Sequence, residues 1–279
     1  MYTGTQENST STWSLKTGLA EFQLLGFNPS KSQIEEWQGR ELPFDVSYDI
    51  REDLSGNQVR PLSIYLKGPD NIIEKVTINI GLHTNVARES GNTQFVNYLG
   101  QFRYANSLEE LEQKYPTFGK ARPAREGEHE LFTFIQRLVR YKATAEGANF
   151  LQDNENAGIT NEAIYNGDYT GLNKLAEYAN EKNLHVIMLL GVKETKNDDG
   201  TFKHRQSIVF KPELIFTSYG KGVTDWHKNR LIEENTQKQS AGYTLTNLLF
   251  TVNYQDFKKE DCINNIPNNP TAAAPGWAV

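Results

Sequence analysis

Aromatic, amide and cationic side chains are interleaved along one stretch of this chain, residues 91–104. Four of the eleven residues from Gln94 to Tyr104 are aromatic, against 11% of the whole chain. Bases of single-stranded nucleic acid stack on aromatic rings, while amide and guanidinium groups bind phosphates and base edges. An extended backbone presents all three kinds of group together, so this stretch makes nucleic acid the leading partner.

Strict alternation along a strand would divide this stretch between two faces. One face would carry Val96, Tyr98, Phe102 and Tyr104. The other would carry Phe95, Asn97, Leu99, Gln101 and Arg103. Burial of one face in a core is the alternative reading for each ring. Gly100 complicates the alternation, because glycine inside a strand often marks a bulge that redirects the following side chains.

Two basic segments add to this binding chemistry. The predicted loop 116–127 carries Arg122 and Arg125 on either side of Pro123, a pattern that suits a phosphate clamp or a solvated loop. Residues 193–230 hold eight Lys or Arg against five Asp or Glu, in a chain of net charge −6. The overall acidity argues against nonspecific binding to a polyanion, whereas the local basic segments favour it.

Catalytic patterns are not found. The five histidines are scattered, and the sequence contains neither a phosphate-binding glycine loop that ends in Lys-Ser or Lys-Thr nor a Gly-x-Ser-x-Gly elbow. Cys262 is the single cysteine, which rules out an intramolecular disulfide and a cysteine-rich zinc site. We therefore expect no enzyme, no cofactor and no metal.

Local patterns predict the elements that position these residues. Residues 19–27 form a strand, a capping box at Ser30 and Gln33 begins a helix, and residues 59–67 pair with 76–83 as a hairpin. The stretch 91–104 then follows as the third strand of an antiparallel meander. Further expected elements are helices at 107–115, 128–142 and 172–182, a hairpin of 184–192 with 202–210, and an irregular segment at 221–239.

These elements predict an α+β fold, with a β-rich OB-fold-like barrel or curved antiparallel sheet and peripheral helices. We expect a disordered leader over residues 1–12, a single OB-like nucleic-acid-binding domain with helical insertions over 13–260, and a flexible tail over 261–279. Neither a secretory signal nor an apolar run of membrane-spanning length is visible, so cytoplasmic residence is the expectation.

Several short motifs occur in a fixed order. They are Asn28-Pro29-Ser30-Lys31, the strand at 59–66, the stretch 90–101, Arg122-Pro123-Ala124, the segment 127–131 leading into Phe134, and a strand ending at Gly191-Val192. In this order the chain resembles single-stranded DNA-binding proteins of tailed phages, notably the crAss-like phages. The resemblance implies an oligonucleotide-binding barrel with an aromatic and basic groove, acting in the bacterial host cell.

The C-terminal tail departs from that resemblance. Many such proteins end in an acidic tail that recruits partners, whereas the last acid here is Asp261. Trp277 remains a docking residue for replication proteins, and self-association is a further expectation.

The first interpretation is therefore a non-enzymatic protein that coats and protects single-stranded DNA in phage replication or recombination. The residues expected to contact DNA are Arg88, Phe95, Tyr98, Phe102, Arg103, Tyr104, Arg122, Arg125, Lys193, Lys203 and Arg205. The alternative is a phage structural or scaffold protein that makes protein–protein contacts through a β-rich surface. A third interpretation is an enzyme or nuclease accessory whose site is assembled from distant residues.

Overall fold

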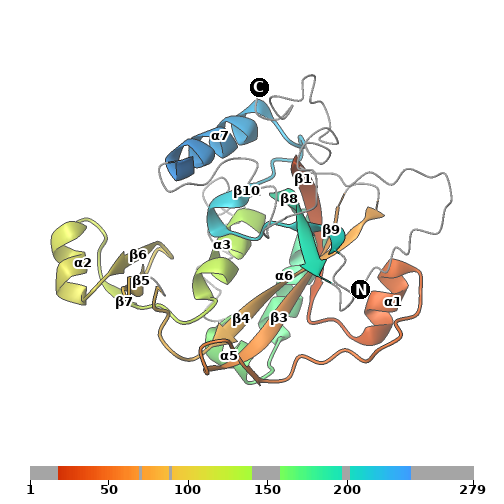
Figure 1. Cartoon of the computed structure of the whole chain (residues 1–279), viewed down its shortest axis with the longest axis horizontal. Coiled ribbons are helices and arrows are strands. Elements are labelled where there is room, and N and C mark those ends of the chain that lie inside the picture. The colour runs from red at the N-terminus through yellow and green to blue at the C-terminus, as the bar shows by residue number, and fades with distance from the viewer. Residues whose placement is uncertain (1–17, 69–70, 88–89, 140–157, 197–201, 240–279) are drawn as a thin grey trace. The chain divides into compact units, whose positions relative to one another are not determined.

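The computed structural model describes residues 18–68, 71–87, 90–139, 158–196 and 202–239. These residues form an α+β fold with mostly antiparallel sheets, which confirms the predicted class at that level (Figure 1). Contacts divide the chain into a larger unit, residues 20–188 and 210–227, and a smaller unit, residues 1–19, 189–209 and 228–279.

The main sheet of the larger unit is built around β3 (Gln58–Lys67), which pairs antiparallel with three strands. These are β1 (Gly18–Phe27), β2 (Arg51–Glu52) and β4 (Ile73–Gly81). Beyond β1 the order continues through β8 (His185–Lys196) to β10 (Ile215–Thr217). Within the described residues no hydrogen bonds join β4 to β10, so this sheet is not closed into a barrel.

The hairpin of β3 and β4 pairs without a break from Val59–Gly81 to Lys67–Ile73, as predicted. Alternation gives it one apolar face and one polar face. Leu62, Ile64 and Leu66 of β3 and Val76, Ile78 and Ile80 of β4 are buried in the core. We call the opposite face, which carries Pro61, Ser63, Tyr65, Lys75, Thr77 and Asn79, the outer face of the hairpin.

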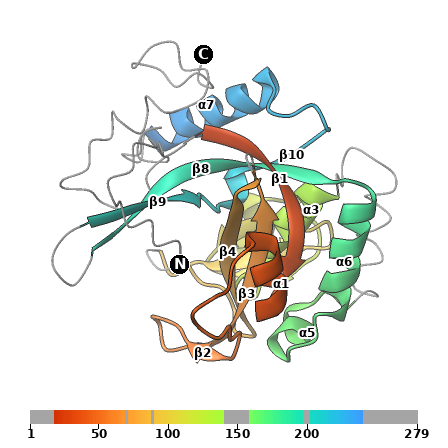
Figure 2. The ribbon, with the colours of Figure 1, turned by 90° about the vertical axis from the view of Figure 1, so that its right-hand side faces the viewer.

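The chain leaves this sheet abruptly at Asn28. The amide of Asn28 replaces the missing strand, because its Oδ1 accepts from the Ser63 N–H at 2.6 Å and its Nδ2 donates to the Pro61 carbonyl at 3.1 Å. The predicted capping box of Ser30 and Gln33 then begins α1 (Lys31–Gln38). The register of β1 against β3 shifts between Leu24 and Gly26, and β1 is visibly curved (Figure 2).

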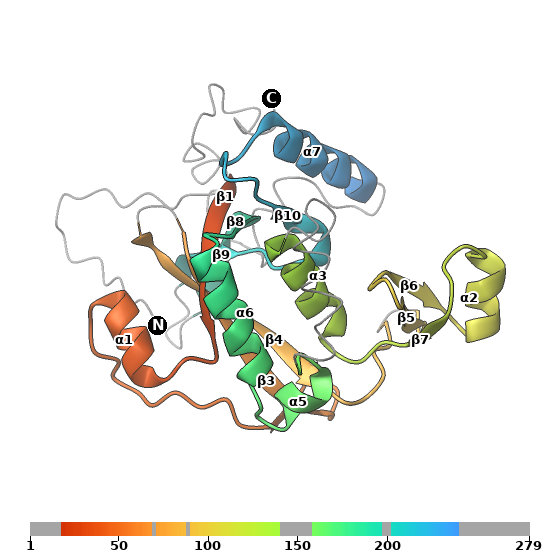
Figure 3. The ribbon, with the colours of Figure 1, turned by 180° about the vertical axis from the view of Figure 1, so that it is seen from behind.

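Helices lie on both sides of the larger unit's sheet (Figures 1 and 3). Ile34 of α1 packs with Tyr65 and Leu42 on the outer side. On the core side, α3 (Glu128–Leu138) buries the predicted apolar stripe and sets Phe134 edge-on to Phe27, with ring centres 6.3 Å apart. The same helix contacts both β4 and β10. Further helical elements are α5 (Asn161–Tyr165), α6 (Thr170–Glu181) and η2 (Pro212–Leu214).

A small substructure, which we call the insertion module (residues 84–126), lies between β4 and α3. Its sheet has the order β6-β5-β7, with β5 (Thr93–Asn97), β6 (Phe102–Ala105) and β7 (Ala121–Pro123). The helix α2 (Leu108–Lys114) begins at the predicted cap, Ser107. Figures 1 and 3 show the module to one side of β3 and β4, beside the start of α3.

The two ends of the insertion module meet. The Gly81 N–H donates to the Glu126 carbonyl and the Glu126 N–H donates to the His83 carbonyl, each at 3.2 Å. Gly127 then begins α3 with φ of 78°, and a Cβ on it would lie 2.3 Å from the Asn79 carbonyl oxygen. A side chain is therefore excluded there, since that contact is with rigid backbone.

The predicted meander is wrong, because residues 91–104 form a hairpin in a separate sheet. The chain reverses between β5 and β6, where Gly100 has φ of 66°. The Asn97 side chain drives this reversal by accepting the backbone N–H groups of Leu99 at 3.0 Å and Gln101 at 2.9 Å. The predicted loop 116–127 also contains a strand, β7, which pairs with β5.

In the smaller unit, the later part of β8 pairs with β9 (Phe202–Ile208) from Leu190–Ile208 to Lys196–Phe202, which confirms the predicted hairpin. The expectation of irregular structure at 221–239 is wrong, because α7 (Asp225–Gln239) lies there. Its sequence is polar on nearly all sides and so lacks the apolar stripe that would reveal a helix. The leader 1–12, residues 145–157, Leu245–Val252 and the tail with Trp277 fall outside the described residues.

Candidate nucleic-acid interface

The four aromatic rings predicted to stack on bases divide into two buried and two exposed. Phe95 is 4% exposed, in a cluster with Ala105, Leu111 and Phe118. Phe102 is 8% exposed and stacks on the His129 ring with centres 4.3 Å apart. Tyr98 and Tyr104 are 79% and 41% exposed. Protein atoms therefore cover the first two rings, and the latter two remain at the surface.

Tyr104 is held by a buried amide. Gln94 is fully buried, and its Nε2 donates to the Tyr104 hydroxyl at 2.9 Å and to Nδ1 of His129 at 3.0 Å. The Asn85 amide donates to Gln94 Oε1 at 3.0 Å. Burial lowers the pKa of His129 and raises the pKa of Tyr104. This network is neutral near pH 7 and joins the insertion module to α3.

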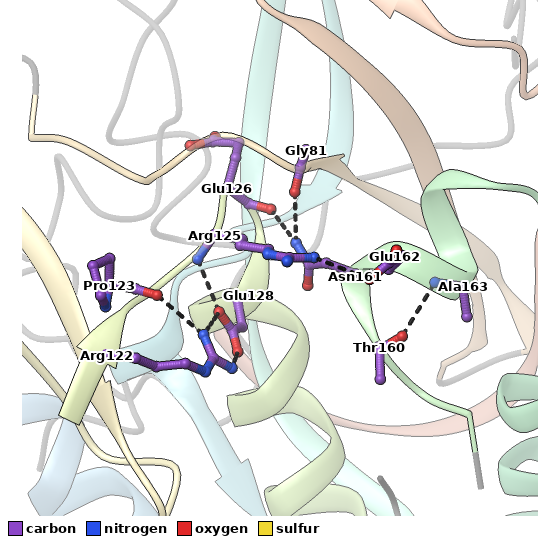
Figure 4. Close-up of polar contacts among 10 residues, drawn as sticks. All are labelled: Gly81, Arg122, Pro123, Arg125, Glu126, Glu128, Thr160, Asn161, Glu162 and Ala163. Carbon is purple, nitrogen blue, oxygen red and sulfur yellow. Dashed lines mark hydrogen bonds and ion pairs between the residues drawn. The ribbon is translucent and has the colours of Figure 1, made fainter. Parts of the chain in front are cut away.

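Arg122 and Arg125 both bind carboxylates (Figure 4). The Arg122 guanidinium donates to both oxygens of Glu128, one at 3.0 Å and the other closer. Glu128 is 3% exposed and also accepts the Arg125 N–H at 2.8 Å. The Arg125 guanidinium lies 3.9 Å from the carboxylate of Glu162. Arg122 and the Arg125 backbone thus support the buried Glu128 carboxylate, which requires such partners, whereas the Arg125 guanidinium faces an exposed carboxylate.

Asn161 fixes the same segment to the sheet. Its Nδ2 donates to the carbonyls of Gly81 at 2.9 Å and Glu126 at 2.8 Å, and Thr160 caps α5 by accepting the Ala163 N–H (Figure 4). One amide thus closes the gap between the end of β4 and the end of the insertion module. The segment of the predicted phosphate clamp thus joins β4, α3 and α5, and phosphate binding by its arginines stays a prediction.

The remaining predicted cations fall in different places. Arg103 is exposed on β6, and Arg88 lies outside the described residues. Lys193, Lys203 and Arg205 lie in the hairpin of the smaller unit, where Lys193 is opposite Arg205 and Lys203 is opposite Thr195. Because residues directly opposite each other share a face, these three positions fall on one face of that hairpin.

The outer face of the β3–β4 hairpin carries a cavity of about 260 Å³. Two cross-strand pairs form part of its lining, Ser63 opposite Thr77 and Tyr65 opposite Lys75. The hydroxyls of Ser63 and Thr77 lie 3.1 Å apart. The segment 44–48 and Arg51 line the rest of the cavity, and Phe44 is 44% exposed.

Three contacts hold the segment 44–48 beside the hairpin. The Tyr48 hydroxyl donates to the Pro29 carbonyl at 2.9 Å, and the Tyr48 carbonyl accepts from Arg60 Nη1 at 2.9 Å. Asp45 lies 3.6 Å from Nζ of Lys31, which compensates its charge. Burial raises the pKa of both Tyr48 and Tyr65, so their hydroxyls remain protonated hydrogen-bond donors at neutral pH.

The lining combines exposed cations, hydroxyls, aromatic rings and the exposed carboxylate of Asp45. Arg51 and Lys75 are both exposed, and Arg51 is oriented by a 3.1 Å hydrogen bond from Nη2 to Oδ1 of Asn79. Drug-sized ligands occupy pockets of roughly 300–1,000 Å³, so this cavity suits a smaller group.

Sequence analysis missed this cavity. The alternation of β3 and β4 was visible and gave the polar face, but the residues of segment 44–51 come from another part of the chain. Only the folded path from Asn28 through α1 returns them to β3. The polar residues Ser63, Lys75 and Thr77 alternate with core residues, and this pattern could have indicated that the second face of the hairpin is available to a ligand.

Among the described residues no group of three or more His, Cys, Asp or Glu side chains is placed to hold a metal ion. None of the helices in those same ranges is both long enough and apolar enough to span a membrane. No family model matched the chain, and neither curated proteins nor solved structures gave a significant match.

Proposed function

We propose that this protein coats single-stranded DNA without catalysis, in phage replication or recombination within the host cytoplasm, and that the outer face of β3–β4 is its primary contact. The observation that carries the proposal is the cavity on this face, because it brings together rings, hydroxyls and two exposed cations. Proteins that bind single strands without sequence preference use this combination.

The strand order of the larger unit supports an OB-like arrangement. From one edge the order is β4-β3-β1-β8-β10. Numbered along the chain as five strands, this order is 3-2-1-4-5, the order that an OB barrel would have if it were opened between its third and fifth strands. The helix α3, which precedes the fourth strand, contacts both open edges. OB folds bind oligonucleotides on the face of strands 2 and 3 and with the loop between strands 1 and 2.

The cavity corresponds to that location. Strands 2 and 3 would be β3 and β4, and the segment 44–51 belongs to the connection between β1 and β3. Phe44, the exposed ring of the lining, would contact bases, and Arg51 and Lys75 would bind phosphates. Rings accept any base and cations accept any phosphate, so we expect weak sequence preference and a strong dependence on salt.

The hairpin of the smaller unit offers separate phosphate contacts. Lys193, Lys203 and Arg205 share one face of it by register. A run of cations on one strand face binds a polyanion without reading its sequence. We propose these positions as auxiliary contacts that raise affinity.

The test is fluorescence anisotropy of a labelled oligo-dT of about 30 nucleotides, at about 50 and about 200 mM salt. We expect saturable binding that weakens at the higher salt, and a loss of about tenfold in the double variant Arg51→Ala, Lys75→Ala. Lys174→Ala is the matched control, because Lys174 is exposed on α6 away from the cavity lining. Absence of saturable binding by the wild type at low salt would contradict the proposal.

A protein-contact role is the second candidate function, and one observation favours it. Tyr219 and Trp226 are each 52% exposed, and Trp226 packs edge-on against Phe216 with ring centres 6.4 Å apart. Exposed aromatic residues of this kind are enriched at protein interfaces. Light scattering coupled to size-exclusion chromatography tests self-association, which a Trp226→Ala variant should weaken.

A further inference from the structure

The exposed end of the insertion module carries a second group of rings and cations, which we call the tip surface. It consists of Tyr98, Arg103, Lys114, Tyr115 and Lys120. Tyr98 is 79% exposed and belongs to the turn between β5 and β6, and the others come from β6, from the end of α2 and from the segment before β7. None of these residues lines the cavity on the β3–β4 hairpin.

Buried groups hold the turn that presents Tyr98. Asn97 is 5% exposed, and its Nδ2 donates to the Phe118 carbonyl at 2.6 Å while its Oδ1 accepts the N–H groups of the turn. The Tyr98 ring lies beside Gly119, where a Cβ would come within 3.3 Å of it. The ring is therefore supported on one side by backbone and open on the other.

Two cations of the tip surface contact the half-buried Tyr115 ring, and a third follows Gly119, the residue beside Tyr98. The Arg103 guanidinium lies 5.6 Å from the centre of the Tyr115 ring and 6.0 Å from that of Phe118. Nζ of Lys114 lies 5.7 Å from the same Tyr115 ring, and Lys120 follows Gly119 in the chain. The acids of the adjacent helix α2 include Glu109 and Glu110 in its first turn, whereas Lys114 is in its last turn.

We propose that the tip surface is a second contact for single-stranded DNA, which binds a more distant part of the strand held on the β3–β4 face. The inference rests on the proposed function. Charge complementarity selects the occupant, since an open ring at the same end of the module as three cations suits a base and its neighbouring phosphates.

The geometry makes this contact dependent on DNA length. The bridge between Val86 and Thr93 ties the base of β5 to the loop that follows β4. The five residues of β5 then carry the chain about 17 Å to the turn, at about 3.3 Å per residue. An oligonucleotide too short to span both surfaces occupies the β3–β4 face alone, whereas a longer one binds both and gains from the high effective concentration of its free end.

The test compares oligo-dT of about 8 and about 30 nucleotides by anisotropy, for the full chain and its variants. We expect Tyr98→Ala to weaken binding of the longer DNA about tenfold and of the shorter DNA less than about twofold. Lys120→Ala should give a smaller loss of the same kind, and Tyr98→Phe should restore wild-type affinity because it keeps the ring. Lys174→Ala is the matched control, because Lys174 is an exposed residue of α6 outside the tip surface.

Each other result overturns the inference. If Tyr98→Ala and Lys120→Ala bind the longer DNA as tightly as the wild type does, the tip surface is not a second contact. An equal loss with both lengths makes the tip the primary site rather than the second. If the wild type binds neither length of DNA, both the proposed function and this inference are wrong. Circular dichroism and thermal unfolding verify that each variant is folded.

Discussion

The outer face of the β3–β4 hairpin and the insertion module use their side chains in opposite ways. The hairpin belongs to a large sheet, so one face suffices for its core and the other can line a cavity. The small sheet of the module is covered on both faces, by α2 over Phe95 and by α3 over Phe102. A sheet of three short strands is stabilised by packing against helices, so the positions left for binding lie at its exposed end.

The largest expected effect is the loss of stability when a buried ring of the aromatic stretch 91–104 is removed. Phe95→Ala should destabilise the protein by about 3–5 kcal/mol because it empties a buried ring site, whereas Tyr98→Ala should cost under about 0.5 kcal/mol. Urea unfolding followed by tryptophan fluorescence and circular dichroism measures both. A stable Phe95→Ala variant that loses DNA affinity would reverse our assignment of the two rings.

The arginine segment gives the next test. Arg122→Ala should cost about 1–3 kcal/mol of stability, since it leaves the buried Glu128 carboxylate without its strongest partner. The half-exposed guanidinium keeps the figure below that of a fully buried pair. DNA affinity at low salt should change less than about twofold. Lys120→Ala, which removes a cation without a buried partner carboxylate, serves as the control for stability.

The salt dependence of binding distinguishes the cavity from the module's arginines. Removing one phosphate-binding cation should reduce the slope of log affinity against log salt by about 0.7 for a single strand. Lys75→Ala and Arg51→Ala should each lower the slope by that amount, and Arg125→Ala should leave it unchanged because Arg125 lies against Glu162. If all three variants had the same slope of log affinity against log salt, the outer face of the hairpin would not be the primary contact.

The smallest effect is a pH dependence confined to the module. Burial holds the pKa of His129 below its ordinary value of about 6.5, so the folded protein binds fewer protons than the unfolded chain over the interval between the two pKa values. Stability contributed by neutral His129 is therefore complete above about pH 6.5 and is lost as the pH falls through the lower, folded pKa.

The measurement is urea unfolding at about pH 7.5 and about pH 5, for the wild type and His129→Gln. The wild type should lose more stability on acidification than the variant, since glutamine does not titrate. Affinity of the β3–β4 face for a short oligonucleotide should be the same in both proteins. An identical loss of stability in wild type and variant would show that His129 does not contribute.

The elements that sequence analysis predicted correctly are those with local signals. Ser30 with Gln33 marked the start of α1. The alternation around Ile64 and Ile78 predicted the β3–β4 hairpin. The helix α3 was visible from its apolar stripe. In each case residues within a few positions of one another fix the structure.

The candidate site was predicted only in part, because its determinants are not local. Whether Phe95 or Tyr98 is exposed depends on Asn97, whose amide reaches the Phe118 carbonyl 21 residues away and reverses the chain. The partners of Arg122 and Arg125 lie in helices that no spacing rule connects to them. Composition located the aromatic stretch, but burial decided which of its rings could bind.

The backbone hydrogen bonds that join Gly81 and His83 to Glu126 have a consequence for how the protein could be altered. A chain that leaves and re-enters a fold at neighbouring points can be shortened there without separating the surrounding strands. A turn of a few residues could therefore replace the module while β4 keeps its pairing with β3. In such a protein α3 would expose His129 and Phe132, which the module now covers, so polar residues would be needed at those two positions.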